Sequence, residues 1–253
     1  MNDARLERVQ VQGDTLRRLT GKDPKPVIPY CLGVSECYTT LRPEQLLPRG
    51  PSPHVEVVEL DTFVAADVCV RRGDRVAVLN MASAVTPGGG YLSGAPAQEE
   101  DLCRRSDMAP ALERAYEDGL YCIPDRAMFV VPDVDVFKGP RPEYALLSSG
   151  FKVGVLVAAA YCCPPLTADN RLPDVYARSM KEKMKLLLAA AYVHGYTTLV
   201  LGAWGCGAFG NPPQHIAELF KEVLESWGAA FPRVTFAIVG DGNAEVFARV
   251  FGK

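Results

Sequence analysis

The chain has 253 residues, of which 48% are hydrophobic and 23% are charged, and its formal net charge is −3. This length and composition are typical of one compact soluble domain. The slightly negative charge offers no general attraction to nucleic acid or to an anionic membrane, so any binding of phosphate must come from local geometry.

The first residues of the chain, MNDARLERVQ, contain no apolar segment like that of a secretory signal. Apolar runs elsewhere are too short to cross a bilayer. We therefore expect an intracellular protein, cytoplasmic or nuclear. The eight cysteines form no CxxC pair and have no histidines at ligand spacing, which argues against a zinc site and favours reduced thiols.

The N-terminal segment, residues 1–53, is predicted to be a helical and proline-rich extension packed on the domain. Residues 3–19 place apolar side chains among many charges, a pattern that indicates one or two helices broken near Gly13. Closely spaced prolines make residues 22–53 an irregular arm that wraps the domain.

From His54 onward strands and helices alternate, which predicts a catalytic domain over residues 54–253. Residues 55–60 and 75–82 are predicted strands, separated by a helix over 61–73. Two strands joined through a helix should be parallel, and both should be largely buried. The glycine-rich stretch that follows then emerges at the carboxyl end of a central strand, where open α/β sheets bind their ligands.

The rest of the chain continues this alternation. Further strands are predicted at residues 128–137, 151–160, 197–204 and 233–240. Further helices are predicted at 99–119, interrupted before Pro110, and at 175–194, 214–227 and 243–251. This order implies a three-layer α/β/α domain with a mixed, mostly parallel central sheet.

Two glycine-rich loops each follow a strand and lead into a helix. The first contains Gly88, Gly89 and Gly90, and the second contains Gly205, Gly207 and Gly210. Glycine lets the backbone approach a ligand closely, so consecutive N–H groups can converge on a phosphate beside a helix N-terminus. Two such loops suit a diphosphate, although either one could be a simple tight turn.

The second loop also matches the pattern G-x-G-x-x-G, which is typical of dinucleotide-binding oxidoreductases. In those proteins an acid at the end of the next strand contacts the ribose, about 20 residues farther on. The candidate acid here, Asp241, lies too far along the chain. An NAD(P)-dependent oxidoreductase therefore stays an alternative, while the absence of G-K-[ST] after either loop disfavours a P-loop nucleotidase.

Two adjacent carboxylates, Glu99 and Glu100, follow the first loop at the start of a predicted helix. Acids in a first turn stabilise a helix by themselves, but beside a glycine loop they also suit proton transfer. Adjacent side chains point in different directions, so these two cannot flank one bond as a glycosidase pair does. One should transfer a proton while the other binds.

The stretch PGGGYLSGAPAQEE, residues 87–100, resembles the GGG, short spacer, QEE signature of poly(ADP-ribose) glycohydrolases of the macrodomain superfamily. LNMASA before it and DLCRRS after it resemble the microbial-type branch. LGAWGCGAFGNPP at 201–213 is similar to the second ligand loop of that family. The resemblance covers residues 54–250 and implies a macrodomain that hydrolyses poly(ADP-ribose) with neither metal nor cofactor.

The resemblance also implies a role for each matching residue. Glu100 falls on the catalytic glutamate, and Glu99 falls on the acid that helps to bind the ribose hydroxyls. Asn80 and Phe209 fall on positions beside the distal ribose. The positions that resemble diphosphate-binding residues are Gly88, Gly89, Gly90, Gly205, Cys206, Gly207 and Ala208.

Two further positions complete the predicted substrate site. Gln98, which opens the QEE motif, is assigned to substrate binding. Asp61 falls where macrodomains often place an acid that contacts adenine, although an aspartate before a helix is also an ordinary N-cap.

The resemblance implies poly(ADP-ribose) or an ADP-ribosylated protein as the substrate. We expect a monomer that binds neither nucleic acid nor membrane directly. Two alternatives remain: a macrodomain that binds ADP-ribose without turnover, and a hydrolase of another ADP-ribosyl linkage. Arg104 and Arg105 are expected on a solvated helix face, with a contact to phosphate as the alternative, and Cys162 and Cys163 are expected to pack after a strand.

Overall fold

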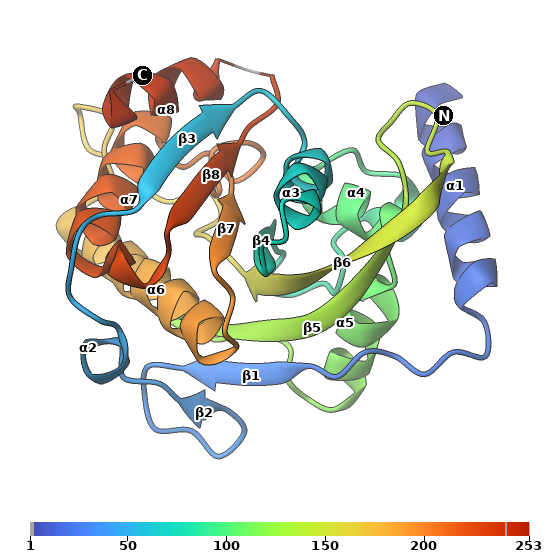
Figure 1. Cartoon of the computed structure of the whole chain (residues 1–253), viewed down its shortest axis with the longest axis horizontal. Coiled ribbons are helices and arrows are strands. Elements are labelled where there is room, and N and C mark those ends of the chain that lie inside the picture. Colours follow the sequence, from blue (N-terminus) through green and yellow to red (C-terminus); the bar gives the residue numbers. More distant parts are fainter. Residues whose placement is uncertain (1–2, 241, 253) are drawn as a thin grey trace.

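The computed structural model describes residues 3–240 and 242–252, and the strands found there form one mixed sheet (Figure 1). The strands are β1 (Ile28–Cys31), β2 (Thr39–Thr40), β3 (His54–Val58), β4 (Val76–Met81), β5 (Ala127–Lys138), β6 (Leu146–Ala158), β7 (Thr198–Leu201) and β8 (Arg233–Ala237). Their order across the sheet is β2-β1-β5-β6-β4-β7-β8-β3.

Strand β4 lies in the interior of the sheet, between β6 and β7, and is parallel to both. Its apolar residues alternate between the two faces because successive side chains of a strand point in opposite directions. Ala77 and Leu79 belong to the core on one face, whereas Val76 and Val78 belong to the core on the other. The predicted central strand is thus confirmed, and its carboxyl end opens into the first glycine loop.

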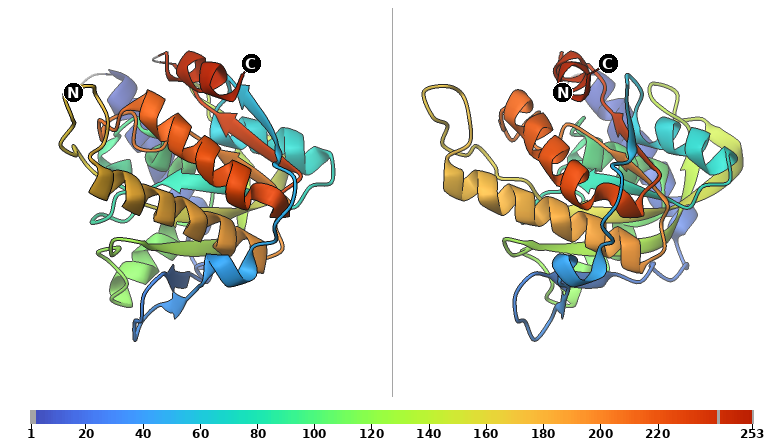
Figure 2. Two further views of the ribbon diagram at one scale, coloured as in Figure 1. Left: turned by 90° about the vertical axis from the view of Figure 1, so that its left-hand side faces the viewer. Right: turned by 60° about the vertical axis from the view of Figure 1, so that its left-hand side comes forward.

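Helices cover both faces of the sheet. They are α1 (Asp3–Leu19), α2 (Pro43–Leu46), α3 (Thr62–Arg71), α4 (Gln98–Arg105), α5 (Met108–Glu117), α6 (Asp174–Val193), α7 (Pro213–Trp227) and α8 (Asn243–Phe251). Helices α6, α7 and α8 enclose one core, and α3, α4 and α5 enclose the other (Figure 2). This arrangement confirms the predicted three layers.

The N-terminal segment is more regular than predicted. Helix α1 runs through Gly13 without a break, because a single interior glycine costs only about 1 kcal/mol and packing of α1 against α4 offsets it. The predicted irregular arm contains β1, which pairs antiparallel with β5, and the short elements β2 and α2. Segments far apart in the sequence therefore share one sheet.

The prediction that both strands around α3 are buried is wrong for β3. This strand pairs only with β8, at the edge of the sheet, and its residues are partly exposed. It is parallel to β4, as predicted, but β7 and β8 lie between the two. A local apolar run does not reveal that two strands from later in the sequence lie between β3 and β4.

The remaining elements follow the predicted order with shifted ends. β6 begins at Leu146 rather than at residue 151, because it continues as a long antiparallel ribbon with β5. The predicted interruption before Pro110 is confirmed: Ser106 and Asp107 separate α4 from α5, and Pro110 lies in the first turn of α5, where proline is tolerated. In the described part of the chain, no helix is both long and apolar enough to cross a membrane.

Candidate active site

The two predicted acids lie at the N-terminus of α4, which begins at Gln98 close to the carboxyl end of β4. The side chains of Glu99 and Glu100 are buried, with exposed fractions of 4% and 7%. The positive end of the helix macrodipole favours carboxylates at this position. Burial nevertheless penalises their charge, so each needs specific hydrogen-bond donors.

Glu99 receives two such donors from the end of β4. Asn80 Nδ2 donates to Glu99 Oε1 at 3.1 Å, and the Ser83 amide donates to Glu99 Oε2 at 2.8 Å. Burial raises the pKa of Glu99 to about 8, since the loss of hydration outweighs the lowering by these hydrogen bonds. This direction favours the neutral form of the Glu99 carboxyl group near pH 7, and a neutral carboxyl group can donate as well as accept a hydrogen bond.

Glu100 is held by the first glycine loop. The Gly90 amide donates to Glu100 Oε1 at 2.8 Å, whereas the buried Glu100 Oε2 has no hydrogen-bond partner among the described residues. An added Cβ on Gly89 would lie 2.5 Å from Glu100 Oε1, and Gly89 has a φ of +58°. Only glycine allows this close approach, so the loop fixes one oxygen of Glu100 while the other, buried oxygen has no partner among the described residues.

The amides of the first loop are already used within the protein. Gly90 donates to Glu100, and Gly89 donates to the Thr86 carbonyl at 3.0 Å. The loop thus orients the acid. Binding of diphosphate by Gly88, Gly89 and Gly90 stays a prediction.

The second glycine loop follows β7, next to β4, so both loops leave the same edge of the sheet. Within the residues that the structure describes, the amides of Gly207, Ala208 and Phe209 donate to no acceptor. Gly207 and Ala208 are exposed, and Phe209 is half-buried. Consecutive free amides are suited to binding an anion together, and the diphosphate contact of this loop stays a prediction.

Packing fixes the start of the second loop. An added Cβ on Gly205 would lie 2.6 Å from Ala160 Cβ, so the loop lies directly against the segment after β6. Burial raises the pKa of the Cys206 thiol to about 12, which keeps it neutral and compatible with a neighbouring anion. Asn211, which sequence reasoning missed, holds the loop: its Nδ2 donates to the Gly205 carbonyl at 3.1 Å.

Two predicted ligand-binding residues are engaged within the protein. Gln98 accepts from the Met81 amide at 2.9 Å and donates to the Leu79 carbonyl at 2.6 Å, so it joins α4 to β4. Asn80 is fully buried beneath Glu99, and its Oδ1 has no partner among the described residues. Their observed contacts position the two acids, and direct contacts with substrate stay predictions.

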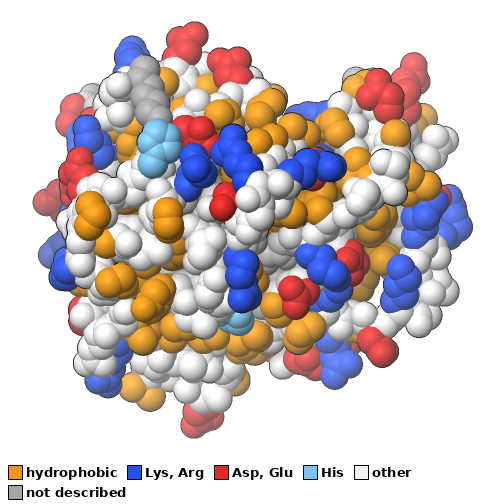
Figure 3. Space-filling view, viewed as in Figure 1, with side chains coloured by type: hydrophobic (Ala, Val, Ile, Leu, Met, Phe, Trp, Pro, Cys, Tyr) orange, Lys and Arg blue, Asp and Glu red, His pale blue; other side chains and the backbone are white. Residues whose placement is uncertain are grey.

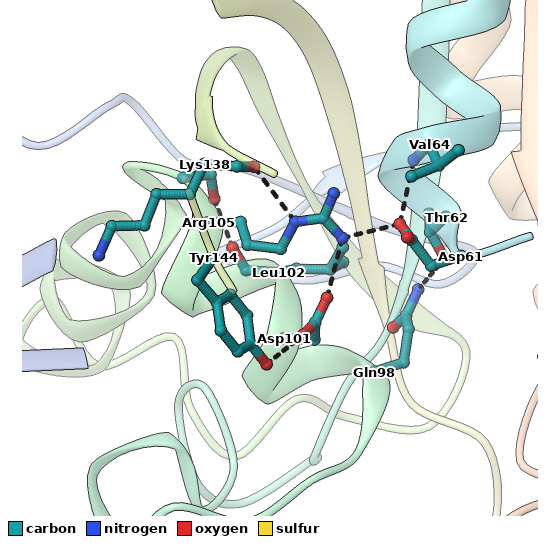
Figure 4. A network of polar contacts seen from close by, with 10 residues as sticks. Asp61, Thr62, Val64, Gln98, Asp101, Leu102, Arg105, Lys138 and Tyr144 are labelled. Atoms are coloured by element: carbon teal, nitrogen blue, oxygen red, sulfur yellow. Dashed lines mark hydrogen bonds and ion pairs between the residues drawn. The ribbon is translucent and has the colours of Figure 1, made fainter. Parts of the chain in front are cut away.

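Asp61 belongs to a network of partly buried charges around the buried Arg105 (Figure 4). Its Oδ1 accepts from the Val64 amide at 3.0 Å, which confirms the N-cap alternative, and also from Arg105 Nη1 at 2.7 Å. Arg105 Nη1 donates to Asp101 Oδ2 at 3.0 Å as well, and Figure 4 shows the guanidinium between the two acids. The adenine contact of Asp61 remains a prediction.

The expectation that Arg104 and Arg105 lie on a solvated helix face is wrong. Their exposed fractions are 0% and 2%. α1 packs against α4 and covers Arg104, whose backbone carbonyl accepts from Thr15 Oγ1 at 2.6 Å. A helix that other elements cover on several sides buries arginines that local patterning assigns to solvent.

Sequence reasoning also missed the contribution of α1 to the site. Arg5 Nε donates to the Ser93 carbonyl, and Arg8 Nε donates to the Gly94 carbonyl, both at 2.7 Å. The carbonyl of Arg5 lies 2.6 Å from the position of an added Cβ on Gly94. α1 therefore holds the spacer between the first glycine loop and the QEE motif. The charge pattern of a helix does not reveal such a partner.

The described residues give little support for a metal site or a dinucleotide site. No group of three or more His, Cys, Asp or Glu side chains is placed there to hold a metal ion. Asp241, the acid weighed for a dinucleotide-binding fingerprint, lies outside the described residues.

A protein family and several solved structures are similar to this chain. Residues 28–138 match the family described as microbial-type PARG, catalytic domain. The structure is similar to poly(ADP-ribose) glycohydrolase (PARG) from Thermomonospora curvata, with 30% identity, a TM-score of 0.76, and coverage of 96% of this chain and 99% of that chain.

Two ligand complexes are also similar to this chain. The T. curvata enzyme bound to the inhibitor ADP-HPD has 30% identity and a TM-score of 0.75, covering 96% of this chain and 98% of that one. PARG from Deinococcus radiodurans in complex with ADP-ribose has 34% identity and a TM-score of 0.65, covering 79% and 85%. A search of curated proteins finds no match.

Proposed function

The chain belongs to the microbial-type poly(ADP-ribose) glycohydrolases, glycosidases that release ADP-ribose from poly(ADP-ribose), and we propose that Glu100 transfers the proton in this reaction. The observation that carries the proposal is the hydrogen bonding of the Glu100 carboxyl group. Gly90 fixes Oε1, while the buried Oε2 is left without a partner among the described residues. A buried polar atom without a partner is costly, and a substrate oxygen would satisfy it.

The reaction needs one group that can act twice. Cleavage of the ribose–ribose bond requires a proton on the leaving oxygen and then a water molecule activated at the anomeric carbon. Glu100 gives its proton to the leaving oxygen and afterwards accepts one from water. The diphosphate of the substrate stabilises the positive charge of the oxocarbenium-like transition state, which explains how a single carboxyl group suffices.

Glu99 binds the ribose rather than transferring the proton. The Asn80 and Ser83 donors hold its two oxygens, and its raised pKa leaves it a hydroxyl hydrogen at pH 7. A neutral carboxyl group donates one hydrogen bond to a ribose hydroxyl and accepts another. This fixes the anomeric carbon relative to Glu100, and positioning of this kind supplies much of the rate enhancement.

The second glycine loop binds the diphosphate. The free amides of Gly207, Ala208 and Phe209 supply several donors without a cationic side chain. The half-buried ring of Phe209 packs against the distal ribose. The face in Figure 3 shows lysines and arginines interspersed with acids rather than gathered into one basic area. Because the net charge of the chain is −3, recognition of the polymer rests on local amides and not on general attraction.

We propose poly(ADP-ribose) and ADP-ribosylated protein as substrates because similar structures contain ADP-ribose or an inhibitor named ADP-HPD. The same proposal includes a monomeric, intracellular enzyme that uses no cofactor and does not bind nucleic acid or membrane directly. Hydrolysis of another ADP-ribosyl linkage is the closest alternative, since the same ribose and diphosphate contacts would serve it.

The decisive experiment compares Glu100→Gln with the unmodified protein. Purified protein is incubated with poly(ADP-ribose), and released ADP-ribose is measured while ADP-ribose affinity is determined by calorimetry. Glu100→Gln should lower kcat by about 10²-fold to 10⁴-fold and leave affinity nearly unchanged, because the amide cannot transfer the proton. Undiminished turnover in the variant would exclude Glu100. Binding of ADP-ribose with no turnover by the unmodified protein would identify a binding module instead.

A further inference from the structure

Two neighbouring cysteines are exposed in the segment that follows β6. The expectation that Cys162 and Cys163 pack after this strand is wrong, since both thiols are free and exposed. Cys162 Sγ donates to Cys163 Sγ at 3.9 Å. The two sulfur atoms therefore already face each other.

This segment is tied to the second glycine loop. The Cys163 amide donates to the Phe209 carbonyl at 2.8 Å. Asn211 Nδ2 donates to the Tyr161 carbonyl at 2.7 Å, from the other end of that loop. Any movement of the backbone between Tyr161 and Cys163 is thus transmitted to the free amides that are proposed to bind the diphosphate.

We propose that Cys162 and Cys163 are a modification site for hydroperoxides, which oxidise them to a disulfide that weakens binding of the ADP-ribosyl group. The effect on ligand rests on the proposed function. Formation of the disulfide depends only on the exposed pair.

The chemistry balances with a hydroperoxide as the oxidant. The Cys163 sulfur, which accepts the hydrogen bond from Cys162, attacks the hydroperoxide, and the Cys163 thiol proton goes to the leaving oxygen. An S–O bond forms, the O–O bond breaks, and an alcohol leaves, or water when the oxidant is hydrogen peroxide. Cys162 then attacks the sulfenic sulfur, so that an S–S bond forms and hydroxide leaves with the Cys162 proton as water.

The geometry of neighbouring residues makes this disulfide reversible and coupled to the loop. Consecutive Cα atoms are about 3.8 Å apart across a trans peptide, less than the 4.4 Å or more of ordinary disulfides, so the bond is strained and easily reduced. The strain acts on the peptide between Cys162 and Cys163. The N–H of that peptide is the group that donates to Phe209, so closing the ring displaces this hydrogen bond.

The test oxidises the full-length protein with hydrogen peroxide. Peptide mapping by mass spectrometry should show the loss of two hydrogen atoms from the peptide that contains both cysteines. Calorimetry should show an increase in the Kd for ADP-ribose of about tenfold or more, because small displacements of positioning groups have large effects. Dithiothreitol should restore both the mass and the affinity.

Matched serine variants assign the effect to the pair. Cys162→Ser and Cys163→Ser should bind ADP-ribose normally and resist oxidation, since each keeps the backbone amide and removes one sulfur. Cys37→Ser removes another exposed thiol and should remain sensitive. Sensitivity that persists in both variants of the pair, or a disulfide that leaves affinity unchanged, overturns the proposal.

A second measurement separates this proposal from the proposed function. Hydrogen–deuterium exchange at residues 205–211 should increase on oxidation without any ligand. Reduced protein that does not bind ADP-ribose contradicts the proposed function, whereas absence of the disulfide, or exchange that does not change, contradicts the modification site.

Discussion

Glu99 links the chemistry of the site to the stability of the fold. Burial raises its pKa from 4.5 to about 8 in the folded protein, so the unfolded chain binds fewer protons between these values. Stability should therefore decrease as pH rises from 4.5 to 8 and level off above it. The loss of stability across this range is on the order of 5 kcal/mol.

Urea unfolding at pH 5, 7 and 9 checks whether the free energy of unfolding decreases as pH rises. Glu99→Gln cannot ionise, so its free energy of unfolding should change less with pH than that of the unmodified protein. The difference between the two proteins isolates Glu99 from other titrating groups. Equal pH dependence in both would show that Glu99 ionises normally in the folded state.

Adding a single methyl group at Gly89 should lower activity strongly and stability only slightly. Its Cβ would lie 2.5 Å from Glu100 Oε1, at a φ of +58° that side chains rarely adopt. Gly89→Ala should lower kcat by about 10²-fold or more, because Glu100 must move, and should cost about 1 kcal/mol of stability.

Gly33→Ala is the matched control for Gly89→Ala. An added Cβ on Gly33 would meet no atom within 4 Å, and no left-handed φ is required there. Steady-state kinetics and thermal unfolding of both variants should show normal turnover for Gly33→Ala. Turnover of Gly89→Ala equal to this control would contradict the contact with Glu100.

At the scale of elements, α1 is a support for the catalytic helix. Arg5 and Arg8 donate to carbonyls of the spacer that connects the first glycine loop to α4. The double variant Arg5→Ala, Arg8→Ala should lower kcat about tenfold with little change in KM. The spacer positions Glu100, whereas diphosphate binding belongs to the second loop.

Arg17→Ala provides the comparison on the same helix. Arg17 is 74% exposed and contacts Asp14 at 4.0 Å, away from the spacer. Its variant should retain normal kinetics, because exposed ion pairs contribute little. A rise in KM at constant kcat in the double variant would place α1 at the substrate instead.

Local signals in the sequence predicted the elements better than their partners. The glycine at position 195 ends α6, and Pro110 marks the start of α5, because such residues act through their own backbone. The two glycine loops are predicted for the same reason, whereas the QEE motif is identified by its resemblance to a family signature. The antiparallel pairing of β1 with β5, and the burial of Arg105 between Asp61 and Asp101, depend on segments far apart in the chain.

At the scale of the whole molecule, the N-terminal segment packs into both cores. Tyr30, Leu41 and Leu47 are buried in the core beneath α6 and α7, and Cys31 is buried in the core beneath α4 and α5. Burial of each of the two leucines contributes about 1.5 to 3 kcal/mol, a large share of the 5 to 15 kcal/mol of a typical domain. The segment therefore acts as part of the core rather than as an appendage.

A fragment of residues 54–253 should accordingly fail to fold. This fragment lacks β1, so the edge of β5 that pairs with β1 would be exposed. Unpaired apolar edges promote aggregation. A fragment of residues 20–253 lacks only α1 and should fold with lowered activity. Circular dichroism, thermal unfolding and size-exclusion chromatography compare the two. Cooperative unfolding of the 54–253 fragment at the full-length midpoint would show instead that the catalytic domain is independent, because β5 then needs no partner.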